Sequence, residues 1–520
     1  MVKLLTNKTF LGFVIYVLVL IAGFFLIPVN RLNPYSRDLL FIIGIIGIWR
    51  YSWFLLNGIR AFIYKKFRFK KIREYEQKAG KELDPDYVFL LITTFRISTE
   101  VTIKVYKAAI EEAINCGYNV SLIASIVEMS EERLIRKIFL NLNPPERVKL
   151  IITRIKGTGK RDALAAGFKV IANANVDFDR SVVAVIDGDS ILTKDSIKKT
   201  VRLFMLNENL GALTTDEDED DHLLVYGKGL AEKIYYYWYK LRFAQRNMSM
   251  CSIALSDRIL TLTGRMSLIR ANIAKQRYFS NIVQMDELKH WRLGEFYFLT
   301  GDDKSSWFAV ASEGWDMWYV PDVMVYTVDE IPDRNFFKGS IMLMVRWFGN
   351  QYRTNARALK LSHEKLNLYP WYALIDQRIT KWTTLYGLSL GILGSIKWGF
   401  GIFYAYIWWI MFTRLLMVFV YRFSRKHILP VWPFFLYYNQ VIGSLIKIYV
   451  WEHMYKQKWT RQKTTLKGAA GFTEWYRKVS SDGMVIVDIL VFLIIIAFLV
   501  QLLTFNDVFN FLQFIKGGIL

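Results

Sequence analysis

Two aspartates, Asp187 and Asp189, stand one residue apart directly after the apolar run Val182–Ile186. A strand that ends in this way offers carboxylate oxygens to a hard divalent cation and leaves coordination positions open for substrate phosphates. A short acidic triplet is also common in turns, where Asp accepts backbone hydrogen bonds. Its place at the end of a buried-looking strand favours a cation site.

A second pair of carboxylates, Asp302 and Asp303, follows Gly301 and the apolar stretch 296–299. From the residues alone, a polar turn and a reactive carboxylate fit this pattern equally well. The pair is therefore a candidate for acid–base chemistry, with the polar turn as its alternative.

Lys160 ends a glycine-containing stretch, Gly157-Thr158-Gly159, that resembles a phosphate-binding loop. The Walker pattern fails, because its first Gly is missing and Arg161 replaces the Ser or Thr after the Lys. ATP hydrolysis is thereby disfavoured. Two interpretations stay open: an ordinary loop before a helix, or a turn that presents Lys160 to a phosphate or a sugar carboxylate.

The elements that must position these residues alternate between short apolar runs and helical stretches. The expected strands are 87–92, 120–127, 148–155 and 182–186, and the expected helices are 100–116, 131–142 and 161–173. This alternation predicts an α/β fold with a mainly parallel sheet, in which ligands bind at the carboxyl ends of the strands. We expect the acidic run 216–221 to be a solvated loop.

Hydrophobic segments of membrane-spanning length flank this region. The 520-residue chain is 53% hydrophobic, and the segments 10–29 and 39–56 predict a helical hairpin. The basic run 64–71 follows it, so the positive-inside rule places the N-terminus and the polar region in the cytoplasm. Such loops explain much of the net charge of +22, and we expect no nucleic-acid partner.

The C-terminal part contains further predicted membrane segments at 385–395, 400–420 and 484–503. The segment 431–451 is long enough to span, but basic residues flank it on both sides, which favours a helix in the membrane interface. We therefore expect five crossings, with the C-terminus outside.

Four residues of the segment 346–357 are spaced by four, three and four positions, which places them on one face of a helix. They are Arg346, Asn350, Arg353 and Arg357, and Trp347 adjoins them. From the spacing alone, a solvated basic stripe is the simplest interpretation.

Several stretches, taken in order, resemble one group of enzymes. They are Thr93-Thr94-Phe95-Arg96, Val127-Glu128-Met129-Ser130, Gly157–Asp162, Asp187-Gly188-Asp189, Lys240–Arg246, Leu299–Phe308, Arg346-Trp347 and Trp459-Thr460-Arg461-Gln462. Together they are similar to the processive, inverting glycosyltransferases such as cellulose and hyaluronan synthases. Within that group, they resemble the catalytic subunits of bacterial alginate (mannuronan) synthases.

The resemblance implies roles for the acidic residues and for the Arg-Trp pair. Asp187 and Asp189 would hold Mg²⁺ or Mn²⁺ against the donor diphosphate, and Asp303, with Asp302 beside it, would be the general base. Arg346 would lie near the diphosphate and Trp347 against the acceptor sugar. The Gln usual in the family three residues before this Arg is Leu343 here.

The resemblance also implies a donor site, to which we assign Thr94, Arg96, Glu128, Lys160, Asp187 and Arg461. A carboxylate such as that of Glu128 can accept two adjacent N–H groups of guanine, although a surface Glu is equally plausible. Arg461 lies in a stretch similar to the gating loop that closes over the donor in these synthases; a basic cytosolic loop is the alternative.

The expected enzyme is a processive glycosyltransferase of the bacterial inner membrane. It would have a GT-A type domain in the cytosol, extend mannuronate chains from GDP-mannuronate and translocate the polysaccharide across the lipid bilayer. By the same resemblance, a separate cyclic di-GMP-binding co-polymerase subunit would regulate it. Three alternatives are a UDP-sugar-dependent synthase of a hyaluronan- or cellulose-like polymer, a non-catalytic export scaffold, and a transferase that adds one sugar to a lipid-linked acceptor.

The expected organisation has four parts. They are a helix pair at 1–63, the GT-A domain at 64–335, interfacial helices with the Arg-Trp pair at 336–382, and C-terminal transmembrane and interfacial helices at 383–520 with a gating-like loop at 455–470.

Overall fold

The computed structural model describes residues 2–32, 34–157, 159–225, 229–458, 471–507, 509–510 and 513. The chain divides into two compact units. The sheet unit comprises Asn57–Ile375 and Met454–Gly468, and the helical unit comprises Met1–Leu56, Asp376–His453 and Ala469–Leu520.

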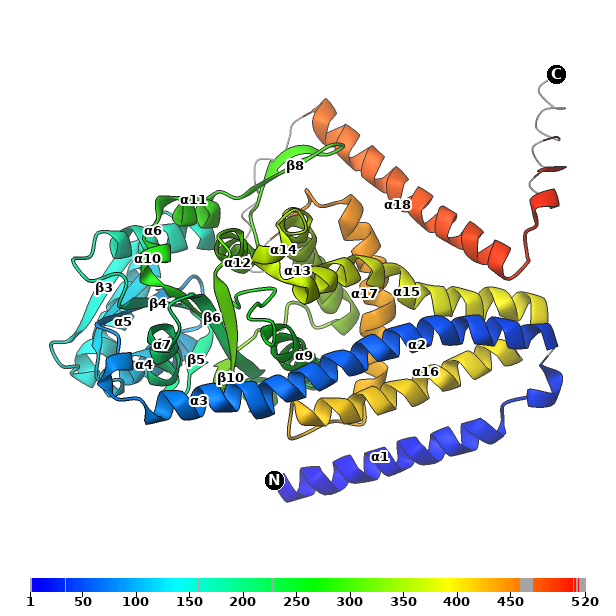
Figure 1. Cartoon of the computed structure of the whole chain (residues 1–520), viewed down its shortest axis with the longest axis horizontal. Coiled ribbons are helices and arrows are strands. Elements are labelled where there is room, and N and C mark those ends of the chain that lie inside the picture. The colour runs from blue at the N-terminus through cyan, green and yellow to red at the C-terminus, as the bar shows by residue number, and fades with distance from the viewer. Residues whose placement is uncertain are drawn as a thin grey trace. The chain divides into compact units, whose positions relative to one another are not determined.

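An eight-stranded sheet, with the strand order β3-β2-β1-β4-β7-β6-β10-β5, forms the centre of the sheet unit (Figure 1). The strands β1 (Tyr87–Thr93), β2 (Asn119–Ile126), β3 (Val148–Arg154) and β4 (Ser181–Asp187) are parallel to one another. They confirm the four predicted strands to within about one residue at each end, and with them the α/β class. Strands buried on both faces are continuous apolar runs, which is why the sequence marked them clearly.

The second half of the sheet was not predicted. It consists of β5 (Ser190–Leu192), β6 (Leu210–Glu219), β7 (Met266–Arg270) and β10 (Asp316–Thr327). β6 and β10 are parallel, whereas β7 runs antiparallel to both β4 and β6. A separate hairpin pairs β8 (Glu287–His290) with β9 (Gly294–Tyr297).

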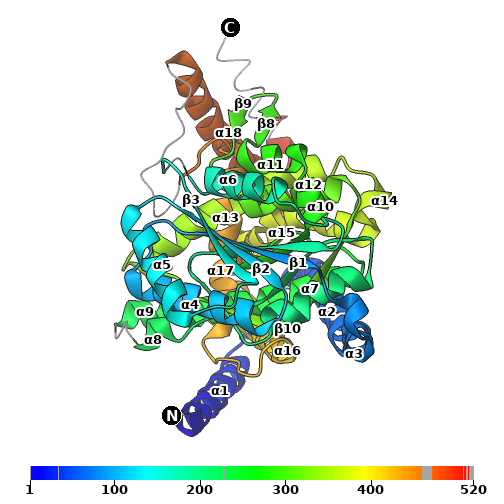
Figure 2. The same cartoon turned by 90° about the vertical axis from the view of Figure 1, so that its left-hand side faces the viewer.

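Helices cover both faces of the sheet, with α6, α10 and α11 on one side and α4 and α7 on the other (Figure 2). The helices α4 (Thr99–Asn115), α5 (Met129–Leu142) and α6 (Lys160–Ala172) confirm the three predicted helices. The remaining helices of this unit are α3 (Phe69–Lys78), α7 (Ser196–Leu206), α8 (His222–Val225), α9 (Leu230–Ala254), α10 (Ala271–Ala274), α11 (Arg277–Gln284), α12 (Asp302–Ser312), α13 (Phe336–Ala358) and α14 (His363–Leu366).

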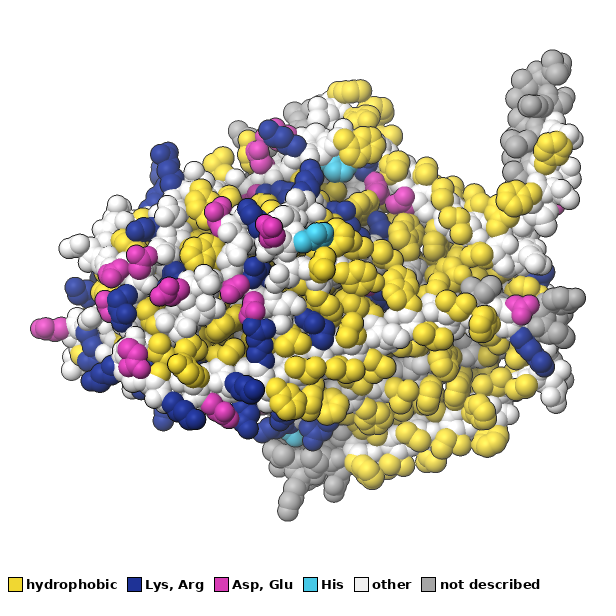
Figure 3. Space-filling view, in the orientation of Figure 1, with side chains coloured by type: hydrophobic (Ala, Val, Ile, Leu, Met, Phe, Trp, Pro, Cys, Tyr) yellow, Lys and Arg dark blue, Asp and Glu magenta, His cyan; other side chains and the backbone are white. Residues whose placement is uncertain are grey.

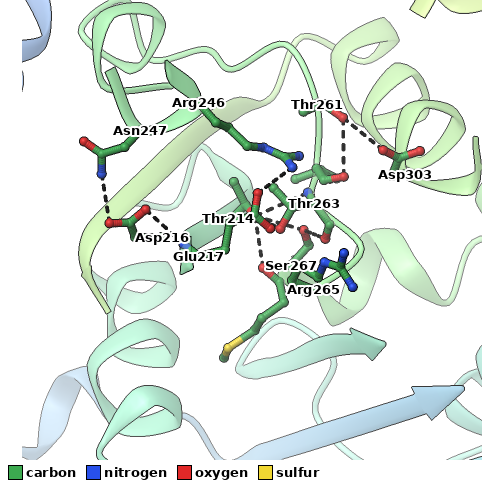
Figure 4. Close-up of polar contacts among 12 residues, drawn as sticks. Thr214, Asp216, Glu217, Arg246, Asn247, Thr261, Thr263, Arg265, Ser267 and Asp303 are labelled. Atoms are coloured by element: carbon green, nitrogen blue, oxygen red, sulfur yellow. Dashed lines mark hydrogen bonds and ion pairs between the residues drawn. The ribbon is translucent and has the colours of Figure 1, made fainter. Parts of the chain in front are cut away.

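The expectation that the acidic run 216–221 forms a solvated loop is wrong, because most of the run belongs to β6 and is buried. Asp216 accepts hydrogen bonds from Asn247 (2.9 Å) and from the Tyr319 hydroxyl (2.6 Å), and Glu217 forms an ion pair with Arg246 (Figure 4). Burial raises the pKa of Glu217, and Arg246 opposes that rise. Partners supplied by α9 and β10 thus offset the cost of burying the charges.

The helical unit contains α1 (Val2–Phe25), α16 (Gly401–Val420), α17 (Trp432–Glu452) and α18 (Phe472–Leu499), and α2 (Pro34–Ile63) and α15 (Leu368–Trp398) contribute to both units. Among the residues that the structure describes, three helical segments of this unit are long and apolar enough to cross a membrane: 8–25, 401–423 and 472–499. The crossings expected in α2 and α15 stay predictions, as does the interfacial position of 431–451.

Large apolar side chains on these helices are exposed. Phe10 and Phe25 of α1 are 71% and 79% exposed, and Ile486 of α18 is 59% exposed. On the face seen in Figure 3, hydrophobic side chains cover much of the helical unit, whereas Lys, Arg, Asp and Glu are spread over the sheet unit. Apolar surface of this extent is typical of contact with lipid.

Candidate active site

The carboxyl end of β4 carries Asp187 and Asp189, next to the end of β1. Thr93 and Asp187 are paired in the parallel register. A Cβ added to Gly188 would lie 2.6 Å from the carbonyl oxygen of Thr93, so only glycine permits this close approach of the two strand ends. The Asp-Gly-Asp triplet is thereby held at the sheet edge where ligands bind in α/β folds.

Lys160 connects this triplet with the second pair of carboxylates. Its ammonium lies 2.6 Å from Oδ1 of Asp187 and 2.7 Å from Oδ2 of Asp302. Burial alone would lower the pKa of the ammonium, but the two carboxylates outweigh burial and raise it. Burial raises the pKa of Asp187 to about 6, against the opposing effect of Lys160. Two acidic motifs far apart in the sequence are therefore both paired with the Lys160 ammonium.

Asp303 lies in the first turn of α12, where the helix dipole favours a carboxylate. The preceding Gly301 has φ +87°, a left-handed conformation that suits glycine. Asp303 is partly exposed, and its Oδ2 accepts a hydrogen bond from the Thr261 hydroxyl at 3.4 Å (Figure 4). Asp302 instead is buried beside Lys160.

The segment 261–265 before β7 contacts three of the four candidate carboxylates, and the sequence analysis missed it. Thr261 binds Asp303, and Arg265 donates to Oδ1 of Asp189 at 2.8 Å. A Cβ on Gly264 would lie 2.5 Å from Oδ2 of Asp187. The segment contains no pair of acidic residues, and its apolar residues do not repeat at helical spacing. Only its tertiary contacts therefore identify it as part of the candidate site.

Gly264→Ala is expected to lower the catalytic rate at this site by roughly 10²-fold, because the added methyl group must displace the Asp187 carboxylate. The turnover rate and the affinity for Mn²⁺ measure the effect, and the thermal unfolding midpoint checks the fold. Gly44→Ala in α2 is a matched control, since no heavy atom lies within 4 Å of its added Cβ. Unchanged activity of folded Gly264→Ala would contradict the assigned geometry.

Residues of α13 hold the loop before α12. Arg353 is 1% exposed and donates to the Thr300 hydroxyl at 3.1 Å and to Asn350 at 2.6 Å. Arg357 donates to Asp286 at 2.8 Å, and Asp286 accepts a hydrogen bond from Ser305 of α12. The solvated basic stripe expected for this helix is therefore wrong for Arg353, which supports the loop directly before Asp302 and Asp303 of α12.

Trp347 packs against α9. Its ring stacks on Trp238, with centroids 5.7 Å apart, and the Arg242 guanidinium lies 3.2 Å from its centroid. Arg346 is half-buried on the same helix, and Leu343 is buried. The structure thus places Trp347 in an aromatic and cationic cluster.

The other predicted donor-site residues follow neighbouring strands. Thr94, just after β1, is buried and shares a hydrogen bond of 2.9 Å with the Tyr106 hydroxyl. Arg96 and Glu128 are exposed in the connections that follow β1 and β2. Arg461 lies outside the described residues, as does most of the gating-like loop at 455–470.

Asp187 and Asp189 fit a divalent cation whose coordination shell would be completed by phosphate oxygens of the substrate. The buried Oδ1 of Asp187 is paired with the Lys160 ammonium at 2.6 Å, which balances its charge. Within the described ranges, no three His, Cys, Asp or Glu residues form a complete metal-binding group. Mg²⁺ typically uses one or two carboxylates together with phosphates, which matches this incomplete set.

Comparisons with known proteins agree with a transferase fold. The model of the family "Glycosyltransferase like family 2" matches residues 85–350. The chain is 43% identical over 474 residues to glycosyltransferase alg8 of Pseudomonas syringae pv. tomato (strain ATCC BAA-871 / DC3000), covering 91% of this chain and 94% of the relative. It is 44% identical over 459 residues to glycosyltransferase alg8 of Azotobacter vinelandii, covering 88% and 91%.

Among solved structures, the mannosyltransferase PcManGT from Pyrobaculum calidifontis, in complex with GDP-Man and Mn²⁺, aligns with a TM-score of 0.39 and 13% identity. The alignment covers 75% of this chain and 98% of that one.

Proposed function

Because the chain belongs to glycosyltransferase family 2, we propose that it polymerises mannuronate from GDP-mannuronate in alginate synthesis and translocates the polymer across the bacterial inner membrane. The sheet unit would work in the cytosol, and a separate cyclic di-GMP-binding subunit would regulate it. The similarity to two proteins named glycosyltransferase alg8, over about nine-tenths of the chain, supports the assignment.

The observation that carries the proposal is the convergence of Asp187 and Asp302 on the Lys160 ammonium. It brings a site suited to a diphosphate next to Asp303, which is a candidate general base. When bound, Mg²⁺ or Mn²⁺ held by Asp187 and Asp189 would neutralise the charge of the departing diphosphate. Lys160 stands where it can shift from the carboxylates to a phosphate oxygen.

In the proposed reaction, the acceptor hydroxyl oxygen forms a bond to the anomeric carbon of the donor sugar. The bond from that carbon to the diphosphate oxygen breaks, and GDP leaves with the electron pair. The Asp303 carboxylate takes the proton of the hydroxyl. A direct displacement of this kind inverts the anomeric carbon.

A polar stripe on α17 supports translocation. Its members, spaced by three or four residues, are Tyr437, Gln440, Ser444, Lys447 and Trp451. They extend over about 21 Å at 1.5 Å per residue, most of the roughly 30 Å of a bilayer core. Lys447 donates to Thr380 of α15 at 3.2 Å, and Gln440 accepts from Arg414 of α16 at 2.6 Å. This stripe suits a helix that crosses the bilayer, the alternative to the interfacial position of 431–451.

Inverted membrane vesicles, whose cytosolic face points outward, test this function. With GDP-mannuronate and Mn²⁺ we expect long polyuronate chains inside the vesicles, protected from an added polyuronate lyase until detergent is supplied. GDP should compete with the donor far better than UDP. Vesicles with the Asp303→Asn variant are the control.

Each alternative predicts a different outcome of this experiment. Incorporation from a UDP-sugar alone would identify another polysaccharide synthase, and transfer of a single sugar would identify a non-processive enzyme. The absence of any metal-dependent turnover would favour an export scaffold. Polymer that is digested without detergent would contradict translocation.

A further inference from the structure

Arg242 of α9 differs from the basic residues around it. Lys240 forms an ion pair with Asp218 at 3.2 Å, and Arg246 forms one with Glu217. Arg265 contacts both Asp189 and Asp329. Among the described residues, no carboxylate lies within ion-pair distance of Arg242 and none accepts a hydrogen bond from it; its close contacts are with aromatic rings. Asp329 and Glu217 act on its charge only from a greater distance. A partly buried cation without a close anion is costly, because burial removes water and no direct partner replaces it.

The aromatic contacts orient the Arg242 guanidinium. It lies 3.2 Å from the centroid of Trp347 and 5.3 Å from that of Trp238, and these two rings stack on each other. A guanidinium at such a short distance lies against the ring face, so its N–H donors point outward in its own plane. A planar fork of donors matches the two oxygens of a carboxylate.

Burial lowers the pKa of Arg242 to about 9. The group therefore remains a cation at neutral pH, although its charge is less stable than that of an exposed Arg. A bound anion would stabilise the charged guanidinium and so offset part of the solvation that burial removes.

Arg242 is connected to the elements that carry the candidate base. Arg246 follows one helical turn later, about 6 Å along the axis, and the charges of both Arg246 and Asp303 act on the buried Lys304 of α12. On α13, Trp347 precedes Asn350, whose Cγ would lie 2.9 Å from a Cβ on Gly301. Arg242 is therefore linked through Trp347 and Asn350 of α13 to the start of α12, the helix that carries Asp303.

We propose that Arg242, oriented by Trp347, binds the carboxylate of the terminal uronate of the acceptor chain. It thereby makes the enzyme specific for an acidic polymer. This inference rests on the proposed function, since it takes Asp303 to act at the same acceptor. The same fork also suits a phosphate oxygen of the donor, and the two sources of the anion are separated experimentally.

The test uses the full chain in detergent and the variant Arg242→Gln. Isothermal titration measures binding of a short oligomannuronate, of a neutral mannose oligosaccharide and of GDP with Mn²⁺. We expect roughly ten- to hundredfold weaker binding of the oligomannuronate, as for a lost charge-assisted hydrogen-bond pair. Binding of the neutral oligosaccharide and of GDP should not change. Arg136→Gln, which removes an exposed Arg of α5, is the matched control.

Two results would overturn the proposal: wild-type oligomannuronate binding by Arg242→Gln, or a loss confined to GDP, which would make Arg242 a donor-phosphate ligand. If Arg242→Gln does not fold, Arg242→Lys decides, because it keeps the charge and loses the planar fork. Weaker oligomannuronate binding with unchanged GDP binding then supports the proposal, and unchanged binding of both refutes it. A wild-type chain that incorporates no mannuronate disproves the proposed function itself, whatever the variants do.

Discussion

Asp303→Asn is expected to lower polymer synthesis by roughly 10²–10⁴-fold, the usual contribution of a general base, while the protein folds and binds donor normally. The side chain is partly exposed in the first turn of α12, and its contact with the Thr261 hydroxyl at 3.4 Å survives the isosteric change. An amide cannot take the proton of the acceptor hydroxyl. Release of GDP and incorporation of labelled sugar measure the loss, and titration with GDP measures donor binding.

Glu313→Gln is the control for this variant, because it removes an exposed carboxylate at the other end of the same helix. It should keep full activity. Asp303→Asn with wild-type turnover would exclude Asp303 as the base. Loss of GDP binding together with activity would show instead that Asp303 shapes the donor site.

Asp187→Asn is expected to weaken Mn²⁺ binding at least tenfold and to lower the transfer rate by more than about 10²-fold, since a metal ion contributes several kcal/mol to such reactions. The amide loses the charge that now balances the Lys160 ammonium 2.6 Å away. Lys160 would then pair with Asp302 alone. Electron paramagnetic resonance of bound Mn²⁺ gives the affinity independently of turnover.

The exposed Asp177, in the turn before β4, provides the matched control. Asp177→Asn removes a carboxylate from the same strand connection and should leave Mn²⁺ binding unchanged. Equal Mn²⁺ affinity in Asp187→Asn and wild type would show that Asp187 is not a ligand, even if activity falls.

The two variants test different halves of one site. Asp187 belongs to the half that would hold the donor, and Asp303 to the half that would activate the acceptor. Thr261 and Gly264 connect the halves, since they lie on one segment that contacts both carboxylates. We therefore expect Gly264→Ala to impair cation binding and transfer together, whereas Asp303→Asn should impair transfer alone.

The sequence alone determined the first four strands, the helices between them and the position of Asp187 and Asp189 at a strand end. These features have local signatures, because a doubly covered strand is a continuous apolar run and an amphipathic helix repeats every 3.6 residues. The apolar segments now seen in α1, α16 and α18 were identified for the same reason.

Only the tertiary structure decided the remainder of the sheet and of the candidate site. β6 carries an acidic run whose sequence predicts a solvated loop. The run can be buried because Asn247 of α9 donates a hydrogen bond to it and Arg246 and Lys240 of α9 form ion pairs with it. The convergence of Asp187 with Asp302, and the contact of Arg242 with Trp347, likewise depend on residues far apart in the chain. Charge compensation between distant segments has no period in the sequence, so only the folded chain shows which charges are paired.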